Sequence, residues 1–370
     1  MALTKKLFSE IITFTRPSGG GRWNAQGQYE WLPANTPRID YDPVTGECLG
    51  LLIEEQRTNL LTYSNEFGTS KDWVWTGITQ TANAGISPDG KNNAWKLTVN
   101  RSGGNYFYKQ VPLTASTTYT GSVYIKNVDC SGIKIFMFEE GTGVSKSLDV
   151  TSQVSTGTWT RVQIQFTTSA SGGTNIRFYV SGNSTGANTS YLVFGAQLEE
   201  GSFPTSYIPT TNAQVTRAAD IASVNELSPW YRQDEGTLFV EASAAGVPPA
   251  AGTSVSFTDG TVANRIIIGQ FFTVTRIGSI GVANVDQATL QVSALTLNSP
   301  HKFAMSWAAN NVAGAVNGGN LRTDSSAAIP SVTRMNIGGL NTAQRFCGHI
   351  RSIRYYPRRL SDSELQALTA

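Results

Sequence analysis

Charged residues are scarce in this chain, at 15% of 370 residues, where about a quarter is usual for soluble proteins. Glycine, threonine, serine and asparagine take their place, and the glutamate-, lysine- and leucine-rich runs that favour helix are almost absent. The formal net charge is only +2, and the basic residues are scattered apart from a short cluster near the C-terminus, at Arg351, Arg354, Arg358 and Arg359. A dedicated nucleic-acid binder needs a concentrated positive surface. The composition therefore predicts an all-β chain that does not bind nucleic acid.

Cysteine and histidine are also rare. Cys48, Cys130 and Cys347 lie far apart without CxxC spacing, which excludes a disulfide framework or a zinc site. His301 and His349 have no HxH or HExxH context, so no histidine-based catalytic or metal site is expected. No apolar run reaches the length of a membrane span or a signal peptide. We therefore expect no cofactor, no metal centre and no membrane insertion; calcium stays open, because loop Asp and Asn residues are abundant but form no recognisable spacing.

The first 61 residues differ in character from the rest. Prolines and a Gly19–Gly21 run interrupt this segment so often that long regular elements are not expected. It nevertheless carries many large apolar side chains, namely Trp23, Tyr29, Trp31, Tyr41, Leu49, Leu51, Leu52 and Ile53. Exposure of so many apolar groups to water is unfavourable. The segment must therefore pack on its own sandwich, a neighbouring subunit or a docking partner. We interpret residues 1–61 as an N-terminal anchor.

Two series of short strands follow the anchor. Residues 62–210 alternate apolar and polar side chains in many short runs, such as 106–111, 119–126 and 160–166, separated by turn signals. After a connector at 211–234, a second series occupies 235–370, and Ser361 with Glu364 forms a capping-box pattern that opens one short C-terminal helix. Many short strands at this spacing are typical of sandwiches and jelly rolls. The prediction is an all-β fold of two antiparallel β-sandwiches, the first jelly-roll-like, behind an irregular anchor.

The sequence offers no catalytic pair. A glycosidase needs two carboxylates on either side of the sugar bond, and strand positions two apart place them on one face. In the last domain Asp362 and Glu364 have this spacing, but they stand at the start of a helix, where capping explains them. We therefore expect a protein that is not an enzyme.

Aromatic residues are the stronger functional lead. Sugar rings stack on Trp and Tyr faces while nearby polar side chains bind their hydroxyls. The candidates for such a glycan-binding platform lie in the first sandwich, at Trp73, Trp75, Tyr106, Tyr108 and Trp159. Trp73 and Trp75 share a face if their segment is extended, as do Tyr106 and Tyr108. The alternative is that part of each set fills the core, as aromatics often do in β-sandwiches.

Several segments resemble parts of known virion proteins. Residues 38–43 (RIDYDP) with 50–61 (GLLIEEQRTNLL) resemble a segment found in tail-fibre, head-fibre and spike-like proteins of tailed bacteriophages. Residues 194–201 (FGAQLEEG) and 204–210 (PTSYIPT) resemble the end of the carbohydrate-binding-module-like jelly roll that follows it in those proteins. Residues 348–361 resemble the late part of a concanavalin A-like, laminin-G-type sandwich. The likeness covers nearly the whole chain.

The resemblance implies a structural or adhesive protein of a phage particle. We expect a fibre or spike subunit on the tail, collar or head, located in the virion and assembled in the host cytoplasm. Its expected partners are other virion proteins through residues 1–61, copies of itself as a homo-oligomer of trimeric type, and host surface glycans as a candidate ligand. Two alternatives stay open, namely a glycan depolymerase of a tail spike and a capsid or collar decoration protein without ligand. A shared fold does not carry over a particular ligand site.

Overall fold

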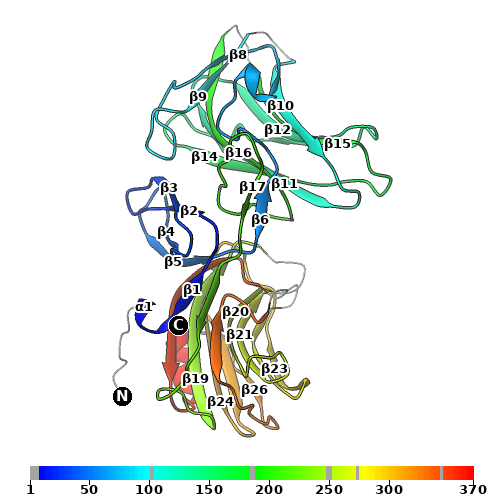
Figure 1. Cartoon of the computed structure of the whole chain (residues 1–370). Coiled ribbons are helices and arrows are strands. Elements are labelled where there is room, and N and C mark those ends of the chain that lie inside the picture. The colour runs from blue at the N-terminus through cyan, green and yellow to red at the C-terminus, as the bar shows by residue number, and fades with distance from the viewer. Residues whose placement is uncertain (1–7, 101–103, 184–187, 247–251, 272–274, 342–344) are drawn as a thin grey trace. The chain divides into compact units, whose positions relative to one another are not determined.

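The computed structural model describes residues 8–100, 104–183, 188–246, 252–271, 275–341 and 345–370 (Figure 1). The chain forms two compact units. The central unit contains Gln26–Trp31 and Gln56–Arg217, and the terminal unit contains Met1–Ala25, Leu32–Glu55 and Ala218–Ala370. Both are β-sandwiches built from antiparallel strand pairs, and a short helix ends the chain. The predicted all-β fold is confirmed.

The central unit packs two sheets against each other (Figure 1). In the described residues, the first sheet has the order β13 (Ser145–Asp149), β12 (Gly132–Glu139), β15 (Asn175–Asn183), β10 (Tyr106–Pro112) and β7 (Val74–Thr76). The second has the order β14 (Thr160–Thr167), β11 (Thr118–Asn127), β16 (Thr189–Glu200), β9 (Trp95–Val99) and β8 (Ile78–Thr81). Two shorter strands, β6 (Arg57–Asn59) and β17 (Val215–Arg217), pair with each other, and a 3-10 turn, η1, spans Thr69–Lys71.

Period-two alternation decides which side chains of the central unit enter its core. Along β10, Phe107, Lys109 and Val111 are buried, while Tyr106 and Tyr108 between them are only partly covered. Successive side chains of a strand point to opposite faces, so the two tyrosines must lie on the outer face of their sheet.

The terminal unit also packs two sheets around one core (Figure 1). In the described residues, one sheet has the order β1 (Thr13–Thr15), β18 (Ile221–Val224), β27 (Arg334–Ile337), β20 (Gly252–Thr258), β21 (Arg265–Phe271), β22 (Arg276–Val282) and β23 (Val285–Gln291). The other has the order β26 (Arg322–Asp324), β25 (Val312–Val316), β24 (His301–Ala308), β19 (Glu235–Ala244), β28 (Gly348–Tyr356), β5 (Cys48–Ile53) and β4 (Ile39–Tyr41). The C-terminal helix α2 (Asp362–Thr369) buries Leu365 over β24 and β25, behind the predicted capping box of Ser361 and Glu364.

The N-terminal residues are part of the terminal sandwich. β1 pairs with β18, β5 pairs with β28, and the side chains of Leu51 and Ile53 enter the core. Gly50 allows the approach of β5, because its φ is +104° and an added Cβ would lie 2.4 Å from the Ile350 carbonyl oxygen. The terminal unit also holds α1 (Phe8–Ile11) and β2 (Gly20–Trp23), whereas β3 (Tyr29–Leu32) begins in the stretch Gln26–Trp31 of the central unit.

This division differs from the sequence-based one. Residues 8–25 and 32–55 group with the last part of the chain, where the sequence suggests a separate anchor at 1–61, and the predicted connector at 211–234 contains β17 and β18. Residues 1–7 of the anchor lie outside the described residues. Docking of this segment to another protein stays a prediction.

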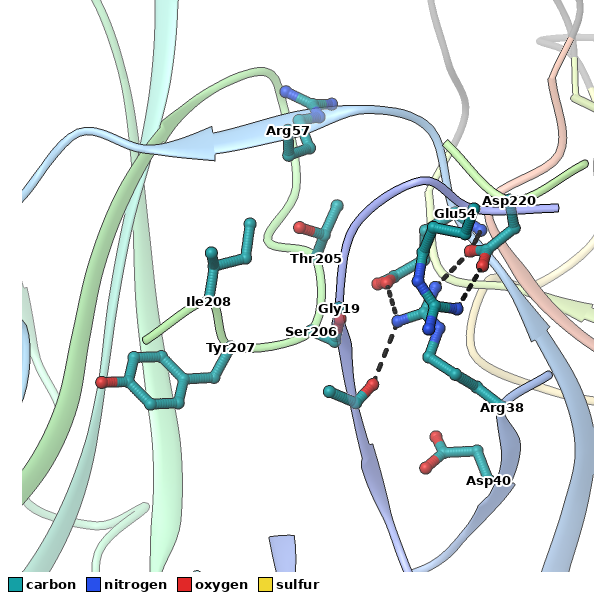
Figure 2. Close-up of polar contacts among 12 residues, drawn as sticks. Gly19, Arg38, Asp40, Glu54, Arg57, Thr205, Ser206, Tyr207, Ile208 and Asp220 are labelled. Carbon is teal, nitrogen blue, oxygen red and sulfur yellow. Dashed lines mark hydrogen bonds and ion pairs between the residues drawn. The ribbon is translucent and has the colours of Figure 1, made fainter. Parts of the chain in front are cut away.

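A buried ion cluster ties the N-terminal segment into the terminal unit (Figure 2). Arg38 contacts the Glu54 carboxylate at 2.6 Å and also pairs with Asp220, whose other oxygen lies 2.9 Å from Arg16. The side chains of both arginines and of Asp220 are fully buried. Burial alone would lower the pKa of Arg38, but Glu54 and Asp220 together raise it above its ordinary value. Arg38 and Glu54, which lie in the segments 38–43 and 50–61, thus have a structural role.

A second buried network lies within the central unit and uses other residues of the same segments. The Asn59 side-chain amide donates to the carbonyl oxygens of Ala196 and Ile208, at 3.2 and 2.8 Å. The buried Glu199 carboxylate accepts from the backbone and hydroxyl of Thr205, and burial raises its pKa. These bonds hold β6 and the 204–210 stretch against β16.

Candidate functional site

The outer face of the β7–β10–β15–β12 sheet carries an aromatic row. Val74, Tyr108, Tyr179 and Phe136 lie opposite one another on these four strands, in that order. The row arises because the alternate positions of each strand, such as Phe107 on β10, fill the core. An aromatic residue that stands between two core positions of a strand therefore lies on the outer face of the sheet.

The rings of the row stack on one another. The centroids of Phe136 and Tyr179 lie 4.0 Å apart with nearly parallel planes, at 14°, and those of Tyr179 and Tyr108 lie 4.5 Å apart at 35°. Tyr106 packs with its edge toward Tyr179 at 5.6 Å. Tyr179 is only 7% exposed as a result. Neighbouring rings therefore occupy the faces of Tyr179, and only a ring at the end of the stack has a face available to a ligand.

Arg177 on β15 completes this face. Its guanidinium carbon lies 5.0 Å from the centre of the Tyr108 ring, and its Nε donates to the Gln110 side-chain oxygen at 3.1 Å. It also forms an ion pair with Glu140. Hydrogen bonds from Asn175, together with the charge of Arg177, lower the pKa of Glu140. The arginine is thus held in place by the protein itself.

A hollow of about 410 Å³ opens at the β7–β10 edge of this sheet, where the stack ends. Tyr108 and Val74 line it on the side of the aromatic row. The remaining lining residues are Leu60, Thr62, Asp72, Lys109, Gln110, Val111, Pro112 and Gln214. A concave site with one aromatic wall and several convergent polar groups has the composition of a small-molecule or sugar site.

Lys109 lies beneath this hollow and is 5% exposed. Its ammonium donates to the carbonyl oxygens of Thr62 and Lys71, at 3.0 and 2.8 Å. It also lies 5.2 and 5.5 Å from the ring centres of Tyr63 and Trp73. Burial lowers the pKa of Lys109 to about 8, and the charge of Asp72 opposes this effect only in part.

The pKa of Lys109 predicts a pH-dependent stability. Below a pH of about 8 the folded protein must hold a buried ammonium, and this penalty is relieved as the pH rises toward the ordinary lysine pKa of 10.5. The relief is on the order of 3 kcal/mol. Chemical denaturation of the wild type and a Lys109→Met variant across this window should show the wild type gaining stability relative to the variant as the pH rises. A difference that does not change with pH would contradict the prediction.

The five predicted platform residues lie in three different places. Tyr106 and Tyr108 lie together on the outer face, as described above. Trp73 is 3% exposed in the core beside Phe67 and Phe107, at 5.1 and 5.3 Å between ring centres. Trp75 is half-buried and stacks on Phe107 at 4.8 Å. Trp159 precedes β14, in the other sheet, and donates its ring N–H to the Ile86 carbonyl oxygen.

Sequence reasoning missed Tyr179, Phe136 and Arg177. The alternation of core and outer-face positions along each strand could have identified them. On β12 the core takes Ile133, Ile135 and Met137, which leaves Phe136 for the outer face. Which of these strands lie side by side could not be inferred, because β10 and β15 are far apart in the chain.

No group of three or more His, Cys, Asp or Glu side chains is arranged to hold a metal ion among the residues that the structure describes. Within the same residues, no helix has the length and apolar character needed to span a membrane.

Comparisons with known proteins give matches among solved structures alone. No protein-family model and no curated protein matches this chain. The Ruminococcus gnavus IT-sialidase CBM40 is 19% identical with a TM-score of 0.32, over 37% of this chain and 84% of that one. The CBM22-1 xylan-binding domain from Paenibacillus barcinonensis Xyn10C is 20% identical with a TM-score of 0.30, over 38% and 94%. The enzymatically active domain of bacteriophage CBA120 tailspike protein 4 is 13% identical with a TM-score of 0.32, over 39% and 21%. In these three cases the similar part is less than two fifths of this chain.

Proposed function

We propose that this chain is a non-enzymatic adhesive protein of a phage particle, and that its central unit binds host surface glycans in the hollow beside Tyr108. The observation that carries the glycan proposal is the 410 Å³ hollow itself, in which one aromatic side chain is surrounded by amide, hydroxyl and carboxylate groups. A pyranose ring has an apolar face that stacks on a tyrosine and hydroxyls that need hydrogen-bond partners. The hollow offers both within one site.

The virion part of the proposal is supported by the segments at 38–61 and 194–210. Their likeness to fibre and spike proteins extends to residues that the structure uses internally, such as Arg38, Asn59 and Glu199. We place the protein in the virion, after assembly in the host cytoplasm, as a fibre or spike subunit on tail, collar or head. Residues 1–61 would contact other virion proteins, and a trimer is the proposed oligomer.

The use of Asp362 and Glu364 supports a role without catalysis. Ser361 accepts from the Glu364 backbone N–H at 3.3 Å and donates its own N–H to the Glu364 carboxylate at 2.8 Å. Hydrogen bonds from Arg358 and Ser361 lower the pKa of Glu364 to about 2. A general acid of a glycosidase needs a raised pKa. This carboxylate is thus suited to capping the helix.

The proposal is tested on the purified full chain and on the particle. A Tyr108→Ala substitution should weaken binding to host surface glycan about tenfold, equal to about 1.4 kcal/mol, because the stacking face is lost. Tyr41→Ala on β4 of the terminal unit is the matched control and should bind like the wild type. If Tyr108→Ala binds glycan as well as the wild type does, the proposed glycan site is refuted. If mass spectrometry of purified particles does not detect the chain, the proposed location in the virion is refuted.

A further inference from the structure

The cations near the hollow are already bound by the protein. Lys109 donates to two carbonyl oxygens and is 5% exposed. Arg177 is paired with Glu140 and bonded to Gln110. Lys71 lies 3.1 Å from the Glu66 carboxylate and 4.4 Å from the centre of the Tyr63 ring. A bound carboxylate would have to compete with these internal partners for each cation.

The groups left for a ligand suit hydroxyls. Gln110 uses its side-chain oxygen for Arg177, which leaves its NH₂ group, and Gln214 uses its NH₂ group for the Leu60 carbonyl, which leaves its oxygen. Asp72 is exposed at the lining and adds a carboxylate that only accepts hydrogen bonds. A sugar hydroxyl can donate and accept, so it can satisfy each of these groups. A ligand carboxylate would instead face the negative charge of Asp72 and the Gln214 oxygen.

We propose that the hollow binds a neutral, hydroxyl-rich pyranose, with its apolar face on the Tyr108 ring, and that it discriminates against acidic sugars. Tyr179 packs on one side of the Tyr108 ring and the Arg177 guanidinium lies 5.0 Å from the ring centre, so the sugar stacks on the part of the ring that lines the hollow. Val74, opposite Tyr108 on β7, forms the apolar floor next to it. Discrimination arises because a desolvated carboxylate without a free cation is costly, whereas a CH₂OH group at the same position is not. This inference rests on the proposed glycan-binding function.

Matched sugar pairs test the inference. The full chain is titrated calorimetrically with methyl glucoside against methyl glucuronide, and with methyl galactoside against methyl galacturonide, which differ only in CH₂OH versus carboxylate. At least one neutral member should bind tenfold or more tightly than its acidic partner, with little change from low to high salt. Its affinity should also stay constant as Lys109 titrates near pH 8.

One variant and the opposite outcomes complete the test. Tyr108→Ala should weaken neutral-sugar binding about tenfold, and the salt series shows whether a cation of the protein takes part in binding. Preference for the acidic members, with affinity lost at high salt or as the pH rises through 8, overturns the inference and leaves glycan binding intact. Binding of no sugar in either set, together with no binding to host surface glycan, overturns the proposed glycan-binding function as well.

Discussion

Replacement of Asp220 by alanine is expected to lower the free energy of unfolding of the terminal unit by about 3–5 kcal/mol, as is usual when one partner of a buried ion pair is removed. The carboxylate pairs with both Arg16 and Arg38, and all three side chains are fully buried. It also accepts the backbone N–H of Glu54 at 2.9 Å. Without Asp220, the cluster holds two buried guanidinium groups against the single carboxylate of Glu54. Amide hydrogen exchange of peptides that contain Trp307, fully buried in the same unit, measures the effect over a series of denaturant concentrations.

The matched control for this substitution is Asp234→Ala. Asp234 also pairs with an arginine, Arg232, but its side chain is 70% exposed. An exposed pair of this kind contributes about 1 kcal/mol or less. Substitution of Arg16 by methionine in the Asp220→Ala background should recover part of the lost stability, because Arg38 and the Glu54 carboxylate then remain as one buried pair. If Asp220→Ala lowers the free energy of unfolding by less than about 1 kcal/mol, the ion cluster does not stabilise the terminal unit as we describe.

Deletion of residues 1–55 is expected to leave the chain insoluble. The deletion removes β5 and so exposes the backbone edge of β28, whose residues Gly348–Ile350 pair with Leu51–Ile53 in the intact protein. Unpaired strand edges promote aggregation. The deletion also removes Leu51 and Ile53 from the core and leaves Asp220 buried without Arg16 or Arg38. Centrifugation of the lysate of expressing cells measures the outcome as the fraction of the protein that is found in the pellet.

The control for the deletion supplies the missing segment as a separate peptide. A peptide of residues 8–55, co-expressed with residues 56–370, should restore soluble protein, because strand addition at an edge needs no covalent link. The same peptide with Gly50→Val should not, since a side chain at this position would meet the Ile350 carbonyl oxygen. Residues 56–370 that are soluble alone, with the stability of the full chain, would contradict a structural role for the N-terminal strands.

The sequence by itself determined the fold class and the phase of the strands. Scarce charge and helix formers, with apolar residues at every second position, are local properties, and they predicted antiparallel sandwiches because a half-buried strand needs that alternation. The capping box at Ser361 and Glu364 was equally local, and the structure contains it. In the same way, Tyr106 and Tyr108 had to share one face of their strand.

Only the tertiary structure decided which strands are neighbours, and this decided the candidate site. Phe136, Tyr179 and Tyr108 are distant in the chain and stack because β12, β15 and β10 pair in that order. Burial separated the tryptophans from the tyrosines, since the shared face of Trp73 and Trp75 is the one that meets Phe107 in the core. Likewise, the pairing of Arg38 with Asp220 joins residues 182 positions apart. Strand order and long-range ion pairs depend on how the whole chain closes, and local alternation carries no information about that.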